Sequence, residues 1–230
     1  PRPRALLTEE TIVSFMMSME YHVAMDFREP VQAVIPGAQG RILAVLSQTS
    51  AELNLRTIAR LSNVSVAQAS RVMPGLVELG LVERREAPPS ALFTFVENHI
   101  AARAVAMLGD VRTSVLEELK VTAGRLGVPP ASVVVYGSFA RGEADRSSDI
   151  DMLVVRPPRV GEDEPGWRAP IDVWVDGVRR LTGNRVETLE VAAEEVGAKL
   201  RSTKQLWQDI LREGLLVYGQ AIEDLDRHSA

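Results

Sequence analysis

Cysteine is absent from this 230-residue chain, which excludes a disulfide framework and a metal site built from thiolates. Histidine is scarce, and His22, His99 and His228 lie too far apart in the sequence to suggest a histidine-ligated zinc ion. No apolar run approaches the roughly 20 residues of a membrane-spanning helix. The first residues also lack the apolar core of a signal peptide. These absences predict a cytoplasmic protein that has no membrane partner.

The composition that remains is typical of a globular protein, with 46% hydrophobic and 25% charged residues. The length suffices for two small domains, each with its own core. A net charge of −5 argues against a general coat for nucleic acid. Residues 38–86 are an exception, because they carry six arginines against four glutamates. This basic segment is where a nucleic-acid contact is expected.

One stretch in the second half combines apolar strands with acidic residues. Residues 133–136 form an apolar, β-branched run that predicts a buried strand. A Gly137-Ser138 turn and a short helix follow, and a second strand then contains Asp149 and Asp151. Strand side chains alternate between faces, so both carboxylates project from the same side. Two adjacent carboxylates need a counter-charge, and Mg²⁺ suits them because it binds one or two carboxylates together with substrate phosphates.

This stretch resembles the minimal nucleotidyltransferases of the polymerase-beta-like superfamily. The signature stands here as G-S-F-A-R-G over 137–142 and S-D-I-D-M over 148–152, with Met152 where the family has leucine. The resemblance implies a nucleoside triphosphate (NTP) as ligand and Mg²⁺ held by Asp149 and Asp151. It also implies that the nucleotide phosphates are contacted by Gly137, Ser138, Arg141 and Ser148. Arg141 has an alternative role, since it can equally pair with Glu143 or Asp145.

The superfamily commonly adds a third carboxylate from a neighbouring strand. Glu187 and Glu190 are the candidates for this third catalytic acid. Their odd spacing puts them on opposite faces of a strand, so at most one of them joins the aspartates. Glu187 follows an apolar residue early in the strand, as the family's third acid often does. If neither glutamate is placed there, the domain is a binding module.

Residues 38–96 read as three helices followed by a hairpin, which resembles a winged helix-turn-helix of the bacterial regulator type. The phrase I-A-R-L-S-N-V-S … L-V-E-L-G-L-V-E-R-R carries the resemblance. It implies that the third helix, capped by Ser65, enters the major groove of DNA. The residues expected to contact DNA are Ser65, Gln68, Ser70 and Arg71 on that helix and Arg84 and Arg85 at the base of the wing. A homodimer would supply two such readers.

The expected fold is an α+β arrangement of two domains. Residues 1–110 form a winged helix-turn-helix domain with an N-terminal helical arm over 8–26, and residues 111–230 form the nucleotidyltransferase-like domain. The second domain is expected to contain a mixed sheet flanked by helices, including one over 167–182 and one over 192–213. A helix break is expected at Gly109-Asp110.

Two functions fit this pairing. In the first, the protein is an Mg²⁺-dependent nucleotidyltransferase that transfers NMP from an NTP to an unidentified hydroxyl acceptor and also binds DNA. In the second, it is a DNA-binding transcriptional regulator whose nucleotidyltransferase-like domain only binds nucleotide or mediates assembly.

Overall fold

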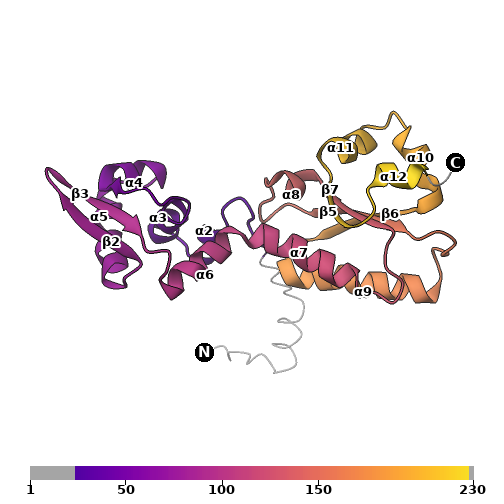
Figure 1. Cartoon of the computed structure of the whole chain (residues 1–230), viewed down its shortest axis with the longest axis horizontal. Coiled ribbons are helices and arrows are strands. Elements are labelled where there is room, and N and C mark those ends of the chain that lie inside the picture. The colour runs from indigo at the N-terminus through magenta and orange to yellow at the C-terminus, as the bar shows by residue number, and fades with distance from the viewer. Residues whose placement is uncertain (1–23, 228–230) are drawn as a thin grey trace, which may run out of the picture.

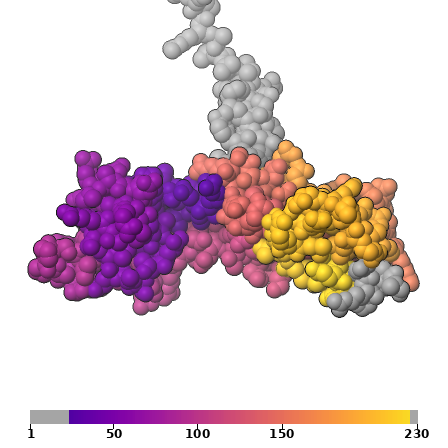
Figure 2. Space-filling model, turned by 90° about the horizontal axis from the view of Figure 1, so that it is seen from above, coloured from indigo at the N-terminus to yellow at the C-terminus, as the bar shows by residue number. Residues whose placement is uncertain are grey.

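The computed structural model describes residues 24–227. Two lobes lie along the long axis of the molecule, the first indigo to magenta and the second pink through orange to yellow (Figures 1 and 2). Most of the helix predicted over 8–26 lies outside the described residues, and its last three residues, 24–26, are not helical. None of the helices within 24–227 has the length and apolarity that crossing a membrane requires.

The N-terminal lobe contains the predicted three helices and hairpin. Its elements are α2 (Pro30–Val34), α3 (Ala38–Leu46), β1 (Leu53–Asn54), α4 (Leu55–Leu61), α5 (Val66–Glu78), β2 (Val82–Ala87), β3 (Ser90–Phe95) and α6 (Ile100–Gly109). The three strands pair antiparallel in the order β1-β3-β2. A single core joins the helices to the hairpin, with Ile42, Ile58, Met73 and Phe93 buried in it.

The start of α5 is set by a capping box. The Ser65 hydroxyl accepts a hydrogen bond from the Gln68 N–H at 3.1 Å, and the Gln68 side chain accepts one from the Ser65 N–H at 2.9 Å. This reciprocal pair satisfies two N–H groups that a helix start otherwise leaves without partners. Ala69, Met73 and Leu76 then follow at helical spacing and are buried against the rest of the lobe.

The C-terminal lobe is built on the predicted mixed sheet. Its elements are α7 (Val111–Ala123), β4 (Ser132–Tyr136), α8 (Gly137–Arg141), β5 (Ile150–Arg156), α9 (Pro165–Thr182), β6 (Val186–Ala192), α10 (Ala193–Leu200), α11 (Gln205–Glu213), β7 (Leu215–Gly219) and α12 (Ile222–Arg227). The strand order is β6-β5-β4-β7, where β5 and β6 run parallel and the other pairs run antiparallel. The expected α+β fold of two domains is confirmed.

Helices cover both faces of this sheet (Figure 1). On one face, Met152 and Val154 of β5 pack with residues of α7 and α9, including the buried Trp167. On the other face, Leu153 and Val155 pack with α10, α11 and α12. Because strand side chains alternate, a residue's number in β5 decides which of the two layers it faces. Odd-numbered residues face the layer of α10, α11 and α12.

The chain after β6 differs from the prediction of one helix over 192–213. Two helices, α10 and α11, are separated at residues 201–204. Within this break the Ser202 hydroxyl accepts a hydrogen bond from the Lys204 N–H at 3.2 Å. Serine that bonds to nearby backbone in this way competes with helical hydrogen bonds, which explains the interruption.

Two segments connect the lobes. One is the junction of α6 and α7, which meet at Asp110, where the helix break was predicted. The other is the segment before α2. Phe27 is buried in the C-terminal core, with its ring 4.7 Å from that of Phe139, whereas Val31 is buried in the N-terminal core. The chain therefore contributes to the C-terminal core before it forms the N-terminal lobe.

Candidate active site and DNA-binding face

Three carboxylates gather at one edge of the C-terminal sheet. Asp149 immediately precedes β5, Asp151 is the second residue of β5, and Glu187 is the residue of β6 that pairs with Asp151. All three numbers are odd, so the side chains belong to the face covered by α10, α11 and α12. Tyr136, the last residue of β4, is paired with Asp151 from the other side. The register of β6 against β5, together with alternation along each strand, therefore groups Glu187 with the two aspartates.

Gly137 lets the Asp151 carboxylate approach the turn that follows β4. Its φ of +70° lies in the left-handed region, which favours glycine. A Cβ atom at this position would lie 2.3 Å from Asp151 Oδ2. The carboxylate thus occupies the space that any other residue's side chain would fill. The G-S turn and the acidic strand are in direct contact.

The clustered charges disfavour ionisation of Asp151. Partial burial raises the pKa of its carboxyl, and the negative charges of Asp149 and Glu187 raise it further. The Arg141 guanidinium opposes this rise, as the smallest of the four effects on the pKa. The pKa of Tyr136 is also raised, first by burial and then by the charges of Asp151 and Glu187. Bound positive charge at this edge would relieve the repulsion.

Arg185 is a basic side chain that contacts two of these acids. Its guanidinium pairs with Glu187 and reaches Asp149 Oδ1 at 4.0 Å. Within residues 24–227, no group of three or more acidic or histidine side chains is arranged to hold a metal ion. Asp149 and Asp151 alone still offer Mg²⁺ the two carboxylates that it commonly takes beside phosphate oxygens. The donor set therefore fits Mg²⁺ together with a nucleotide better than Mg²⁺ alone.

Glu190 lies on the opposite face of β6. It forms an ion pair with Arg156, in which the two side chains are only 14% and 12% exposed. Its Oε1 also accepts a hydrogen bond from Trp167 Nε1 at 2.9 Å. The structure thus joins Glu190 to the layer of α9 and does not bring it to the aspartates.

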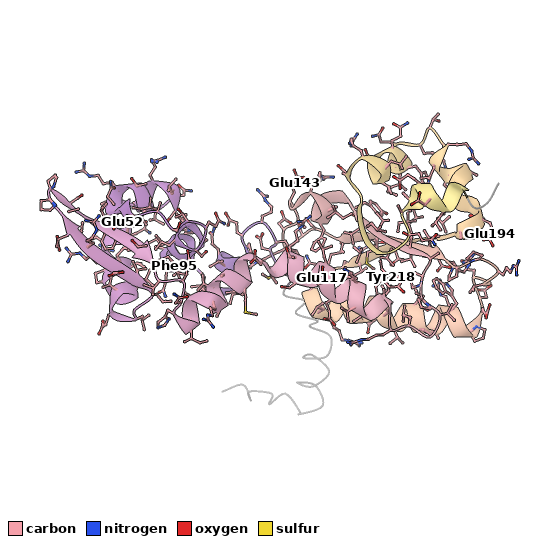
Figure 3. All side chains as sticks on the ribbon, viewed as in Figure 1. Glu52, Phe95, Glu117, Glu143, Glu194 and Tyr218 are labelled. Atoms are coloured by element: carbon pink, nitrogen blue, oxygen red, sulfur yellow. The ribbon has the colours of Figure 1, made fainter. Side chains whose placement is uncertain are left out.

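The other predicted phosphate contacts differ in how free their side chains are. The Ser138 hydroxyl has no hydrogen-bond partner within the part of the chain that is described. Arg141 donates to Glu143 and to Glu213, each at 2.7 Å, so the alternative pairing with Glu143 is present. Glu143 stands beside α8 in Figure 3. The Ser148 hydroxyl accepts from the Asp145 N–H at 3.0 Å and so belongs to the loop before Asp149.

The six predicted DNA contacts are all exposed, but several are engaged within the lobe. The side chains of Ser65 and Gln68 form the capping box. Arg85 makes a two-pronged contact with Glu52, which is labelled in Figure 3, and Arg84 pairs with Glu86 at 2.8 Å.

Ser70 and Arg71 have no side-chain hydrogen bond or ion pair among residues 24–227. Ser70 and Arg84 line a groove of about 1020 Å³ between α5 and the hairpin. Among the predicted DNA contacts on α5, Ser70 and Arg71 can therefore meet a ligand without breaking a side-chain contact.

Comparisons with protein families match both lobes. A model of the nucleotidyltransferase domain matches residues 115–213, which include the three carboxylates and the G-S turn. A model of the IclR helix-turn-helix domain matches residues 40–86, from α3 to the strand β2 of the wing. The chain joins a helix-turn-helix domain to a nucleotidyltransferase domain.

Similarity to solved structures is weak. A structure described as a toxin-antitoxin with AMP-PNP is 16% identical and has a TM-score of 0.34, over 49% of this chain and 82% of that one. A structure of NadR in complex with 4-hydroxyphenylacetate is 15% identical and has a TM-score of 0.32, over 52% of this chain and 85% of that one. A comparison with curated protein sequences gives no match.

One residue at the site of the nucleotidyltransferase domain was not predicted from the sequence. Asn184 lies just before β6, is 1% exposed and hydrogen-bonds the carbonyl oxygen of Ser148 at 3.1 Å. Its role can be recognised only once the fold is known, because the partners of its buried amide lie up to 159 residues away in the sequence.

Replacing Asp151 by asparagine is expected to stabilise the free protein at neutral pH. A carboxyl whose pKa is raised on folding subtracts stability above its folded pKa, and the penalty disappears below its unfolded pKa of about 4. We expect the midpoint of thermal unfolding to rise by about 2 °C at pH 7.5 and to match that of the wild type at about pH 3, below the unfolded pKa. Asp163→Asn, in the exposed loop before α9, is the control. Equal midpoints at pH 7.5, or a gain that persists undiminished at about pH 3, would contradict the coupling of the three acids.

Proposed function

We propose that the protein is an Mg²⁺-dependent nucleotidyltransferase that transfers NMP from an NTP to a hydroxyl group and is directed to DNA by its helix-turn-helix domain. The observation that carries the proposal is the contact between the Gly137 turn and the Asp151 carboxylate, with Asp149 and Glu187 on the same face. A turn with free N–H groups beside a set of acids suits a metal-bound triphosphate.

The residues have separate roles in this reaction. The Gly137 and Ser138 amides and the Ser138 hydroxyl hold the β- and γ-phosphates. Glu187 accepts the proton of the acceptor hydroxyl, whose oxygen attacks the α-phosphorus in line with the leaving group. The bond from the α-phosphorus to the β-phosphate oxygen breaks, and pyrophosphate leaves. Asp149 and Asp151 would hold Mg²⁺, which would supply positive charge to offset the charge of the phosphates.

The contacts of Arg185 support the assignment of Glu187 as the base. In the free protein it neutralises Glu187 and lies near Asp149. Its side chain is 72% exposed, and exposed ion pairs contribute little free energy. Arg185 can therefore separate from these acids at little cost in free energy. A guanidinium matches phosphate oxygens well and can follow an incoming nucleotide. Its departure would free Glu187 to act as the base.

The test is transfer of label from α-labelled ATP, CTP, GTP or UTP in the presence of Mg²⁺ and cell extract as the source of acceptors. We expect the wild type to label an acceptor and Asp149→Asn/Asp151→Asn to lose the labelling. Asp172→Asn, on the exposed side of α9, is the matched control and should behave as the wild type. If no NTP gives labelled product, or the double variant still labels, the enzymatic proposal fails and the regulator that only binds nucleotide is favoured.

We further propose that α5 binds DNA through Ser70 and Arg71 in the major groove, with Arg84 on the backbone. Arginine reads guanine by two parallel hydrogen bonds, and Arg71 is free to do so. This assigns Ser65 and Gln68 mainly to the helix cap and keeps Arg85 on Glu52 unless DNA replaces that contact.

Binding to the DNA upstream of the protein's own gene tests this face. Arg71→Ala is expected to weaken specific binding by about 1–3 kcal/mol, and Arg84→Ala to lower the salt dependence by about one counterion. Arg125→Ala, on the exposed surface of the C-terminal domain, is the control. If Arg71→Ala and Arg125→Ala bind this DNA equally well, α5 is not the reading helix.

A homodimer and a cytoplasmic location complete the proposal. The outer side of α6 carries two strongly exposed apolar side chains, Ile100 at 76% and Met107 at 71%. They lie seven residues apart and so fall on one face of the helix. Pairing of this face between two copies would place two DNA-reading helices in one particle. Analytical ultracentrifugation of the wild type and of Met107→Glu measures the oligomeric state directly.

A further inference from the structure

Asn184 is held in a fixed orientation at the centre of the C-terminal domain. Its Nδ2 donates to the carbonyl oxygens of Ser148 at 3.1 Å and of Asp145 and Met25 at 3.3 Å each. Its Oδ1 accepts a hydrogen bond from the Met25 N–H at 3.0 Å. The amide cannot be reversed, because the carbonyls only accept and the N–H only donates.

The backbone of Asn184 is fixed by the end of α9. Gly183, with φ of +74°, terminates that helix. The Asn184 N–H donates to the Thr182 hydroxyl at 3.2 Å, and this hydroxyl donates to the Val178 carbonyl at 3.0 Å. The side-chain amide therefore projects from a rigid support.

The segment that Asn184 holds leads directly into Asp149. The Ser148 carbonyl belongs to the peptide bond whose nitrogen is that of Asp149. The loop is also stiffened from within, since the Asp145 carboxylate accepts from the Ser147 N–H at 2.8 Å and from the Ser148 hydroxyl at 3.2 Å. On the far side of Asp149, the Ile150 N–H donates to the Arg185 carbonyl at 2.8 Å. Asp149 is thus fixed on both sides by Asn184 and Arg185, the two residues that immediately precede β6.

We propose that Asn184 is a positioning residue, which sets the place of the Asp149 carboxylate by clamping the loop over 145–148. The inference rests on the proposed function, since it assumes that Asp149 binds the metal. Asn184 itself touches no carboxylate of the site and acts only through the backbone. Its partner Met25 makes the segment before α2 part of the same clamp, although that segment lies more than 110 residues before the loop in the sequence.

The test compares the binding of Mn²⁺ alone to the full-length chain by electron paramagnetic resonance. Asn184→Asp keeps the size and the acceptor but places a carboxylate against three carbonyls, so we expect Mn²⁺ to bind at least about tenfold more weakly. Asn184→Ser, which retains a donor, serves as a milder variant should the first not fold. Val178→Ala, in the same helix and 4% exposed, lowers stability without touching the loop and is expected to bind Mn²⁺ as the wild type does.

Hydrogen–deuterium exchange of peptides that cover residues 145–150 measures the clamp without a metal. We expect faster exchange there in both Asn184 variants, and wild-type exchange in Val178→Ala. Unchanged exchange in the folded Asn184 variants, or unchanged Mn²⁺ affinity, would overturn the inference. If the wild type binds no Mn²⁺, or Asp149→Asn/Asp151→Asn binds it equally well, the proposed metal site fails instead, and the exchange experiment alone decides the role of Asn184.

Discussion

Glu187→Gln is expected to lose transfer activity but not stability, whereas Glu190→Gln is expected to lose stability but not activity. The two acids are only three residues apart in one strand. Glu187 lies beside Asp151 and is 48% exposed, so its loss should leave the fold intact. As the proposed base it contributes about 10²–10⁴-fold to the rate of transfer. We expect kcat to fall by that factor while the midpoint of unfolding stays near that of the wild type.

Glu190→Gln removes the charge that pairs with the nearly buried Arg156 and, at 3.7 Å, with Arg168. Breaking such a pair costs about 3 kcal/mol of unfolding free energy at the lower end of the usual range. The lower end applies because Glu194 also interacts with Arg156 from the surface. Glutamine keeps an acceptor for Trp167, so the loss reports on the charge alone. Chemical denaturation measures it, and kcat of the folded variant should remain that of the wild type.

A second substitution distinguishes an unpaired charge from poor packing. Arg156→Met added to Glu190→Gln removes both charges and is expected to recover most of the lost stability. If the double variant is no more stable than Glu190→Gln, the ion pair does not explain the loss. If Glu190→Gln abolishes transfer and Glu187→Gln does not, the assignment of the third carboxylate is reversed.

Gly137→Ala is expected to impair both stability and transfer. A residue other than glycine costs about 1–2 kcal/mol at a left-handed φ such as +70°. The new Cβ would also meet the Asp151 carboxylate at 2.3 Å, so that the carboxylate must move. A displacement of about 1 Å in a catalytic group can lower a rate by about 10²-fold, and we expect a loss of that size in kcat.

Gly142→Ala is the matched control for this clash. Gly142 has a φ of +74°, so alanine there meets the same backbone penalty. A Cβ atom at Gly142 meets no other atom within 4 Å. Gly142→Ala should therefore lose only the stability that the backbone conformation costs, measured by denaturation. Gly137→Ala should lose at least that much, and of the two variants it alone should lose transfer. Equal losses of kcat would show that the contact with Asp151 is unimportant.

The sequence was sufficient for the parts of the fold that depend on local pattern. The capped α5, the hairpin after it and the strands around the G-S turn follow from spacing within short windows, and all are present. Alternation along a strand also predicted that Asp149 and Asp151 share one face and that Glu187 and Glu190 lie on opposite faces. What alternation left open was whether Glu187 or Glu190 shares the face of the aspartates, and this needed the register of β6 against β5.

Contacts between distant segments were beyond prediction. Nothing near Asn184 in the sequence indicates that its amide meets Met25 and Ser148, since those contacts arise only when three distant segments meet. The break between α10 and α11 was missed because the residues there have ordinary helix propensity. The pattern S-x-x-Q at the start of α5 was visible, yet Gln68 was assigned to DNA alone, whereas its side chain also closes the cap.

The burial of Phe27 against Phe139 has a consequence for biosynthesis. The ribosome completes the N-terminal lobe while the partner ring, more than 110 residues downstream, is still untranslated. During that interval the aromatic side chain has no core to enter and stays open to chaperones or to neighbouring nascent chains. Phe27 can therefore take its final place only after translation has passed Phe139.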